Sequence, residues 1–560
     1  MDKDSTNIAK AESFSQPSSS SNISKDISAL EKNASHTPYD HIEELPVREN
    51  IILVSGLAVA LFLAALDNTI VSTALPTIAN DLNSLSLISW VATSYMLSST
   101  ALQPLYGKVS DIFGTKVCLI FAILIFQVGS LISGLSNSMI MLIVARGITG
   151  IGGAGIMVLV SLVISQTIPL RNRGRYMGII GAVFGLSSVV GPLLGGVFTD
   201  KASWRWCFYI NLPLGVVSLL SVIFIVKVKP VSGAMKDKIA RIDFFGVATF
   251  MVALIMILLA LNWGGSSYPW NSARILSLLI VGFVLLIGFI LFEIKFPKEP
   301  LIPMRIFRIR NVAFCLASQF FLGYGMYGVI FYIPIYYNVI HDGTATQSGL
   351  FLLPFMLGLV FSSISSGQFI SRTGIYRPCL WLGTAVLSVG VGLISTFGET
   401  TGNAQHIIYM AIAGIGLGGC MQSMVISVQA SSPPEILSVT TTMVGFFRVI
   451  GGSIGLAIIS AIQSSSLTSS LKAFVAEYPQ FKQIADISRN NSKVIWSKTI
   501  DPIAKDAILQ AYISSLKKVF VSVIPVVVIA FLLTLFIKHV ELKKKGPTES
   551  ANDEAAVVHV

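Results

Sequence analysis

Residues 107–116 read GKVSDIFGTK and connect two apolar runs, 88–106 and 117–135. Each run has about the 20 residues that a helix needs to cross the hydrocarbon core of a bilayer. Asp111 can cap the second helix, and the two lysines of the stretch favour the cytosolic side of a membrane. The stretch therefore predicts a tight cytosolic turn between two antiparallel transmembrane helices.

Apolar runs of the same kind occur along most of the chain. Of its 560 residues, 53% are hydrophobic and 12% are charged, against about 25% charged residues in a typical soluble protein. Fourteen runs are long enough to span a bilayer as helices: 51–74, 88–106, 117–135, 138–164, 176–198, 207–226, 244–262, 275–292, 312–337, 348–370, 378–397, 407–429, 437–462 and 519–537. We therefore predict an all-α polytopic membrane protein with fourteen transmembrane helices.

The basic residues are distributed unevenly over the connections between these runs. Connections from even-numbered to odd-numbered runs contain seventeen lysines and arginines, whereas the short odd-to-even connections contain Lys201, Arg205 and Arg274. Cytosolic loops are enriched in lysine and arginine, so both termini are expected in the cytosol. The same rule accounts for the net charge of +11 without a nucleic-acid partner.

A repeat relates the two halves of this helical region. The spacing of Gly107 and Gly114 recurs at Gly367 and Gly374, a displacement of 260 residues. The fifth run has glycines at 185, 191 and 195, and these recur at 445, 451 and 455 with the same displacement. Helix n then corresponds to helix n+8, which predicts two parallel six-helix repeats with two helices inserted between them, in a 6+2+6 arrangement.

The segment boundaries follow from the runs and from the polar stretches between them. Residues 1–49 are polar and serine-rich and cannot bury enough apolar surface to fold. The expected segments are a disordered cytosolic tail (1–49), an N-terminal six-helix bundle (50–228), two inserted helices with flanking loops (229–299), helices 9–13 of the C-terminal bundle (300–463), a long lumenal or extracellular loop (464–518), helix 14 (519–540) and a cytosolic tail (541–560). The long loop contains a glycosylation sequon at Asn490, although sequons also occur by chance, as at Asn22 and Asn33.

Several classes of function are excluded by motifs that the sequence lacks. It contains no phosphate-binding loop of the G-x-x-x-x-G-K-[ST] type, no HExxH and no GxSxG. The five cysteines are scattered and lie in or beside apolar runs, which argues against a disulfide framework or a metal site. We expect no enzyme activity, catalytic residue, metal or cofactor, so transport would be downhill or driven by a proton or other ion gradient.

Three ionisable side chains lie well inside the apolar runs, where a charge costs about 2.5–3.5 kcal/mol. They are Asp67, Arg146 and Arg448. At a rise of about 1.5 Å per residue, Asp67 and Arg146 fall in the same, lumenal half of the membrane and can pair. Protonation of Asp67 would break the pair and couple a proton to a rearrangement, whereas the alternative role for Asp67 is only to neutralise Arg146. Arg448 contacts either substrate or a backbone carbonyl.

The loop at 107–116, together with LDNTIVSTALP at 66–76, resembles signature sequences of the major facilitator superfamily, in its fourteen-helix drug:proton antiporter branch. The resemblance covers nearly all of 50–540 and implies the major facilitator fold. It also implies that the loop latches conformational states through Lys108 and Asp111. The latch-loop residues are Gly107, Lys108, Asp111, Gly114 and Lys116. Ile112 and Thr115 replace positions that are often basic, which implies a thinner charge network.

Helix 5 resembles the antiporter motif of the same branch. The matching residues are Gly178, Gly191, Pro192, Gly195 and Gly196, with Ser187 where glycine is usual. Small residues also allow close helix packing and proline kinks a helix, so packing alone is the alternative explanation. The resemblance further implies proton transfer at Arg146. The sequence is similar to fungal members of this branch, which include plasma-membrane drug exporters and vacuolar basic amino-acid transporters.

Polar and aromatic side chains at membrane depth are candidates for a substrate cavity between the repeats. They are Gln103, Gln319, Tyr324, Gln422 and Arg448, with Gln127, Tyr327 and Gln429 as further candidates. Hydrogen bonding between helices is their alternative role. One carboxylate and several aromatic rings would suit amphipathic cations, and would equally suit lysine or arginine.

The sequence therefore favours a proton-coupled antiporter that moves drugs, amphipathic cations or basic amino acids out of the cytosol by alternating access. The membrane would be the plasma or the vacuolar membrane. A nutrient sensor with a transporter fold and a proton-independent facilitator are the alternatives. The expected partners are the small-molecule substrate, protons and the lipid bilayer, with no nucleic acid and no obligate protein partner.

Overall fold

The computed structural model describes residues 46–84, 87–226, 228, 231, 233–265, 267–297, 299–342, 345–490, 495–496 and 500–542. Within these ranges the chain is helical almost throughout. Most of the tail expected over 1–49, and of the tail expected over 541–560, lies outside the described residues. The first described helix begins at Val47, four residues before the first apolar run.

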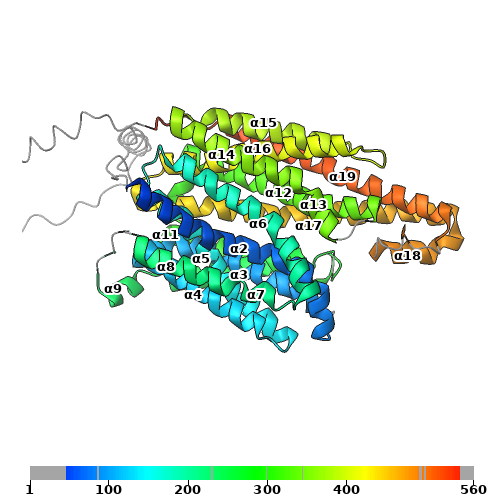
Figure 1. The fold of residues 1–560 in the computed structure, drawn as a ribbon, viewed down its shortest axis with the longest axis horizontal. Helices are drawn as coiled ribbons and strands as arrows, with labels where there is room; N and C mark the ends of the chain where they lie inside the picture. The colour runs from blue at the N-terminus through cyan, green and yellow to red at the C-terminus, as the bar shows by residue number, and fades with distance from the viewer. Residues whose placement is uncertain are drawn as a thin grey trace, which may run out of the picture. The chain divides into compact units, whose positions relative to one another are not determined.

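The helices follow the order of the apolar runs (Figure 1). The first six runs correspond to α2 (Val47–Asp81), α3 (Ile88–Phe113), α4 (Thr115–Gly134), α5 (Met139–Thr167), α6 (Arg173–Lys201) and the consecutive α7 (Trp206–Tyr209) and α8 (Asn211–Ile225). A short α9 (Met235–Ala240) precedes α10 (Phe244–Trp263) and α11 (Ala273–Lys295). The last six runs correspond to α12 (Arg310–His341), α13 (Ala345–Phe351) with α14 (Leu353–Thr373), α15 (Arg377–Ile394), α16 (Asn403–Ser431), α17 (Leu437–Glu477) and α19 (Pro502–Leu535), and α18 (Lys482–Asn490) precedes α19.

The prediction of an all-α polytopic membrane protein is confirmed. In the described part of the chain, thirteen helices are long and apolar enough to cross a membrane. Helix α3 is the remaining predicted span: it has 26 residues but is more polar than the others. The count of fourteen crossings and the cytosolic position of the termini stay predictions.

Gly114 and Gly374, the second glycines of the two repeated loops, explain why both loops are tight. Gly114 follows α3 with φ of 97°, and Gly374 follows α14 with φ of 76°. Residues with a side chain rarely adopt positive φ, whereas glycine does so at little cost. In both places one glycine terminates a helix and the next helix begins within three residues. Both turns therefore need a glycine with positive φ, although the ψ angles differ, 137° at Gly114 and 6° at Gly374.

The helix contacts support the predicted correspondence between the two repeats. Helix α5 packs on α3 and α4, and its counterpart α16 packs on α14 and α15. Likewise, α2 packs on α6 and α8, and its counterpart α12 packs on α17 and α19. Contacts between the repeats obey the same relation, because α6 packs on α14 while α17 packs on α3. The chain thus contains two similarly packed bundles that meet along two equivalent seams.

The inserted helices α10 and α11 pack on each other and cover one of these seams. Helix α10 contacts both α3 and α17. Phe250 of α10 lies 5.8 Å from the ring of Phe446 on α17, and Trp263 lies 5.3 Å from the ring of Trp90 near the start of α3. The insertion is therefore attached to both repeats.

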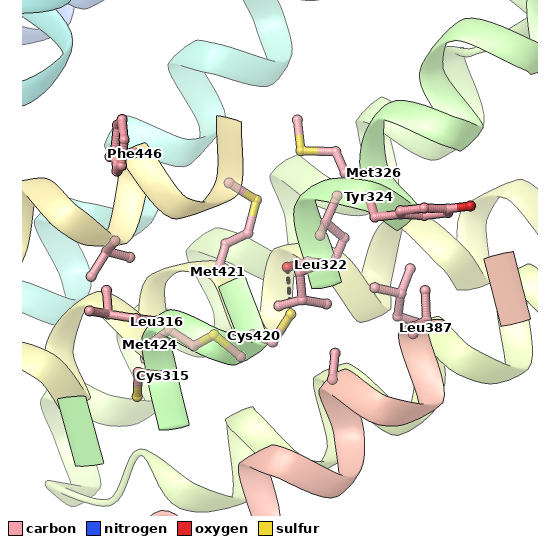
Figure 2. Packing of buried hydrophobic residues seen from close by; sticks show 14 of the residues in the cluster. Cys315, Leu316, Leu322, Tyr324, Met326, Leu387, Cys420, Met421, Met424 and Phe446 are labelled. Atoms are coloured by element: carbon pink, nitrogen blue, oxygen red, sulfur yellow. Dashed lines mark hydrogen bonds between the residues drawn. The ribbon is translucent and has the colours of Figure 1, made fainter. Parts of the chain in front are cut away.

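The second repeat has a methionine-rich core between α12, α15, α16 and α17. Figure 2 shows Met421 and Met424 of α16 beside Leu316 and Leu322 of α12, with Cys420 on the same side. Methionine is unbranched and fills irregular gaps without a fixed shape. A core of this kind can hold the helices while tolerating small shifts between them.

The segment expected as a long loop over 464–518 is largely helical in its described residues. Helix α17 continues to Glu477 and α19 begins at Pro502, so both run past the other helices at one end, where α18 also lies (Figure 1). Leu467, Leu471 and Phe474 recur at helical spacing and are buried in a small core of their own. The loop expectation missed this because the apolar stripe is too narrow to resemble a membrane-spanning run.

Candidate functional site

Asp67 and Arg146 form an ion pair in the interior of the first repeat. Arg146 Nη1 lies 2.5 Å from Asp67 Oδ2, and their side chains are 2% and 0% exposed. Asp67 is on α2 and Arg146 on α5, so the pair joins two helices that are distant in sequence. The contact expected from their depth is present. Removing one member of such a pair leaves a buried charge uncompensated.

Three further groups fix the geometry of this pair. Asn211 donates one amide hydrogen bond to Asp67 Oδ1 (3.1 Å) and also lies 3.2 Å from Ser130 Oγ. The guanidinium carbon of Arg146 lies 4.5 Å from the centre of the Tyr95 ring, a cation–π contact. Arg146 Nε donates to the carbonyl of Val91. The carboxylate and the guanidinium are therefore oriented by α3, α4 and the start of α8.

Sequence reasoning did not identify Asn211 or Tyr95. Asn211 is the polar residue inside the apolar run 207–226, and it is completely buried. A polar side chain in such a run is a functional candidate by the same argument that selects Asp67. Tyr95 gave no signal, because a tyrosine in an apolar run is ordinary.

The glycines after Arg146 allow α5 to approach its neighbours closely. A β-carbon at Gly150 would overlap the Tyr95 backbone and Ser98, and one at Gly153 would overlap the Tyr95 hydroxyl. A β-carbon at Gly152 would overlap the backbone of α4. These glycines therefore set the position of the Tyr95 ring beneath the guanidinium.

The latch loop joins the first repeat to the insertion and to the second repeat. Lys108 Nζ lies 3.0 Å from Glu299 Oε2, and Arg241 Nε lies 2.7 Å from Glu299 Oε1. Hydrogen bonding to Arg241 lowers the pKa of Glu299. Glu299 and Arg241 flank the inserted helices and were not among the predicted site residues. No pattern in the sequence distinguishes these two residues, because charges in loops are common.

Asp111 lies against α17 rather than in water. Burial raises its pKa to about 6, opposed by a hydrogen bond with Ser438 and by the charge of Lys108. A β-carbon at Gly107 would overlap Thr442, also on α17. Lys116 donates to the carbonyl of Ile223 within the first repeat. Gly107 and Asp111 thus contact the other repeat, whereas Gly114 and Lys116 shape the turn.

The small residues of α6 divide into two groups. Gly178 faces the Ser363 carbonyl on α14, across the seam between the repeats. Gly191 and Gly195 face Thr69 and Ile70–Thr73 on α2, inside the first repeat. Pro192 and the half-buried Gly196 lie beside this second group. The predicted antiporter motif therefore mixes an inter-repeat contact with contacts to the helix that bears Asp67.

Contacts at the predicted cytosolic end close the α6–α14 seam. A β-carbon at Gly367 would overlap the carbonyl of Gly174, so the two backbones touch. Arg171, before α6, donates to the carbonyls of Ser371 (3.2 Å) and Arg372 (2.7 Å) at the end of α14. Carbonyls at a helix C-terminus carry partial negative charge, which favours such a cation. The repeats are therefore in contact at this end.

The candidate cavity residues have different surroundings. Gln319 is fully buried, and neither polar atom of its side chain has a partner among the described residues. Gln103 Oε1 also lacks one in the described part of the chain. Gln422 lies beside Gly181 at the α6–α16 contact. Arg448 of α17 is half-buried and contacts Gly323 of α12 through its backbone.

Other candidates make contacts between helices, either within one repeat or, for Gln429, between the two repeats. Gln127 donates to the Leu212 carbonyl, and Gln429 accepts from Arg173. The Tyr324 ring packs on Gly455 and its hydroxyl reaches Ser522 on α19. For these residues the alternative role, interhelical contact, is observed. Asn490 is the last residue of α18, and the Asn491 and Ser492 of its sequon lie outside the described residues.

A cavity of about 180 Å³ lies between α3, α10 and α17. Its lining is mostly apolar, with Thr93, Asn262, Ser453 and Ser460 as its hydrogen-bonding side chains. Thr93 and Asn262 are hydrogen-bonded to each other across the α3–α10 contact. This volume is below the range of about 300–1,000 Å³ that is typical of sites for drug-sized molecules.

Comparison with known proteins gives consistent results for sequence and fold. A family model described as "Major Facilitator Superfamily" matches residues 57–456. The chain is 38% identical over 432 residues to the MFS-type efflux pump MFS1 of Trichophyton rubrum, covering 76% of this chain and 81% of that protein. It is 33% identical over 530 residues to the multidrug transporter protein MdtP of Bacillus subtilis, covering 90% and 96%. The rubrofusarin-specific efflux pump aurT of Gibberella zeae is 37% identical over 425 residues, covering 76% and 78%.

Among solved structures, the human organic anion transporter MFSD10 has a similar fold. Its TM-score is 0.56 at 13% identity, covering 88% of this chain and 100% of that chain. At this identity the likeness concerns the fold alone.

Proposed function

The chain belongs to the major facilitator superfamily and is a membrane transporter rather than an enzyme, and from this premise we propose that it exports small organic molecules from the cytosol in exchange for protons. Relatives named as efflux pumps and as a multidrug transporter support the export direction. The observation that carries the proton coupling is the buried Asp67–Arg146 pair.

The pair can act as a two-state element. With Asp67 ionised, its attraction to Arg146 holds α2 against α5, and Asn211 completes the arrangement. Protonation removes the attraction and leaves Arg146 to the Val91 carbonyl and the Tyr95 ring. A ligand or proton that binds one state better shifts the population toward it. In this proposal the proton enters from the non-cytosolic side and drives the return step.

The α6 glycines provide a route from this pair to the seam between the repeats. Gly191 and Gly195 contact α2 within one or two turns of Asp67, and Gly178 contacts α14 of the other repeat. A shift of α2 is therefore transmitted to α6 and from there to the contact at the cytosolic end. One pH unit supplies about 1.4 kcal/mol per proton, which corresponds to about a tenfold substrate ratio.

The test is transport by purified protein in liposomes with an imposed pH gradient, in wild type, Asp67→Asn and Asp81→Asn. Fluorescein, rhodamine 123 and arginine serve as test substrates. Asp81 is the matched control, because it lies on the same helix and accepts a hydrogen bond from Trp204. We expect gradient-driven accumulation in wild type and Asp81→Asn but not in Asp67→Asn, while downhill substrate exchange persists in all three. If Asp67→Asn accumulates substrate as well as wild type does, Asp67 has no role in proton coupling, and a proton-independent facilitator is favoured.

A further inference from the structure

The positive and negative charges of the side chains inside the apolar runs do not cancel. The fourteen runs contain one carboxylate, Asp67, and two guanidiniums, Arg146 and Arg448. Asp67 is already paired with Arg146. The membrane-embedded part therefore retains one positive charge, and Arg448 carries it.

Arg448 has no acidic neighbour among the residues that the structure describes. The ionisable groups that interact electrostatically with the Arg448 guanidinium are Tyr327 and Cys420. Among the described residues its guanidinium makes no ion pair and no hydrogen bond. An unpaired charge at membrane depth is costly, so its presence at such a site points to function. The alternative considered from sequence, a hydrogen bond to a backbone carbonyl, is absent from the described part of the chain.

Buried amides without partners lie near the same level of the bundle. Gln319 is fully buried with both polar atoms unpaired in the described residues. It precedes Gly323 by about one helical turn, and Gly323 contacts the Arg448 backbone. Gln103, from the first repeat, lies beside Gly445, three residues before Arg448. Buried polar groups are normally hydrogen-bonded, so unpaired amides within about one helical turn of the stretch of α17 that bears Arg448 suggest a ligand.

An aromatic surface accompanies these groups. The ring of Tyr327 packs on Gly452 of α17 and stacks on Phe331 at 6.0 Å with an interplanar angle of 10°. Tyr327 is also within electrostatic reach of Tyr95, whose ring lies under Arg146. The Tyr327 ring, with Phe331 stacked on it, is thus close enough to interact electrostatically with the Arg448 guanidinium.

We propose that Arg448 binds the substrate, and that preferred substrates are aromatic molecules with an anionic or electron-rich oxygen, such as a carboxylate, phenolate or enolate. This inference rests on the proposed export function. The guanidinium presents a planar fork of donors that matches such oxygens, and the amides add neutral donors. On this proposal cations are poorer substrates, because Asp67 is neutralised by Arg146 and an added cation would be repelled by Arg448.

The test compares fluorescein and rhodamine 123, which share a xanthene core but differ in the sign of their charge, with Nile red as a neutral probe. Efflux of each dye is measured from liposomes containing wild type, Arg448→Gln, Arg448→Lys or Arg274→Gln. Arg274 is an exposed arginine in the first turn of α11 and serves as the matched substitution. Wild type and Arg274→Gln are expected to prefer fluorescein. Arg448→Gln should lose about tenfold or more of the fluorescein rate at low concentration, since a charge-assisted hydrogen bond is lost, and should gain in relative rhodamine export.

The variants distinguish the effect of losing the charge of Arg448 from the effect of misfolding. Arg448→Lys keeps the positive charge and should retain most of the preference for fluorescein, and Nile red export by Arg448→Gln shows that this variant is folded. Undiminished fluorescein export by Arg448→Gln would overturn the proposal. Export of rhodamine or Nile red but not fluorescein by wild type would overturn the substrate class while leaving the export function standing. Export of none of the three dyes by wild type would overturn the export function itself, and this inference with it.

Discussion

The Asp67–Arg146 pair predicts a specific pattern of stability in single and double variants. Asp67→Asn removes the carboxylate from a site in which the two side chains are 0% and 2% exposed. Arg146 then keeps the Val91 carbonyl and the Tyr95 ring as partners, but no opposite charge. Breaking a buried pair in this way costs about 3–5 kcal/mol. We expect Asp67→Asn and Arg146→Gln each to destabilise the protein by an amount in this range.

The double variant Asp67→Asn/Arg146→Gln should be less destabilised than the sum of the two single variants. It places an amide opposite an amide, so neither buried position carries an uncompensated charge, and Asn211 can still donate to the oxygen at position 67. We expect a coupling energy of about 2–3 kcal/mol. The measurement is the free energy of unfolding in bicelles during titration with a denaturing detergent, monitored by tryptophan fluorescence, for all four proteins.

Additive effects in this cycle would refute the reasoning. If the double variant loses the sum of the two single losses, the two side chains do not compensate each other and the pair cannot act as a two-state element. An Asp81→Asn variant provides the control, because Asp81 lies on the same helix outside the pair and should change stability little.

Burial raises the pKa of Asp111 to about 6, so the folded protein holds this proton more tightly than the unfolded chain, and Asp111 contributes stability that falls as pH rises from about 4 to 6. Asp111→Asn should abolish this part of the pH dependence, about 3 kcal/mol, when the free energy of unfolding is measured across this range. An unchanged pH profile would show that another group causes the dependence. Gly367→Ala should obstruct the approach of α14 to the Gly174 carbonyl and reduce cysteine cross-linking between α6 and α14 by several-fold, whereas undiminished cross-linking would contradict the closed contact. Tyr512→Phe removes a buried hydrogen bond to the Ser488 carbonyl and should cost about 1 kcal/mol with transport unchanged; a transport defect would show that the α17–α19 extension takes part in the cycle.

The number and sign of the charges in the membrane-embedded region could be predicted from the sequence, but the roles of these charged residues could not. Counting Asp67, Arg146 and Arg448 needs only the apolar runs, and the depth of the first two predicted their contact correctly. The cation-binding expectation treated Asp67 as available to substrate. In the structure this carboxylate is held by a guanidinium and by Asn211, so a cationic substrate would have to compete with Arg146 for it; cation binding stays a prediction.

The α17–α19 extension, the part of these two helices that continues past the other helices, was also only partly predictable from the sequence. Its narrow apolar stripe was present in the sequence, yet the length of the polar stretch favoured a loop. Whether Leu471 and Phe474 form a helix core depends on Tyr512 and Ile508 from a segment about forty residues later. A pattern within one segment cannot supply the surface against which that segment packs.

By itself, the sequence determined the all-α class, the places of the helices, the two repeats and the three embedded charges. These follow from run length, glycine at turns that need positive φ, and the cost of charge in hydrocarbon, all of which are local or counted along the chain. The tertiary structure alone decided that Glu299 joins Lys108 to Arg241, that Asn211 completes the Asp67 site, and that Arg448 has no counter-charge in the described residues. The physical reason is that the partner of a polar side chain is set by distances of a few ångströms between segments far apart in sequence, which helical periodicity does not encode.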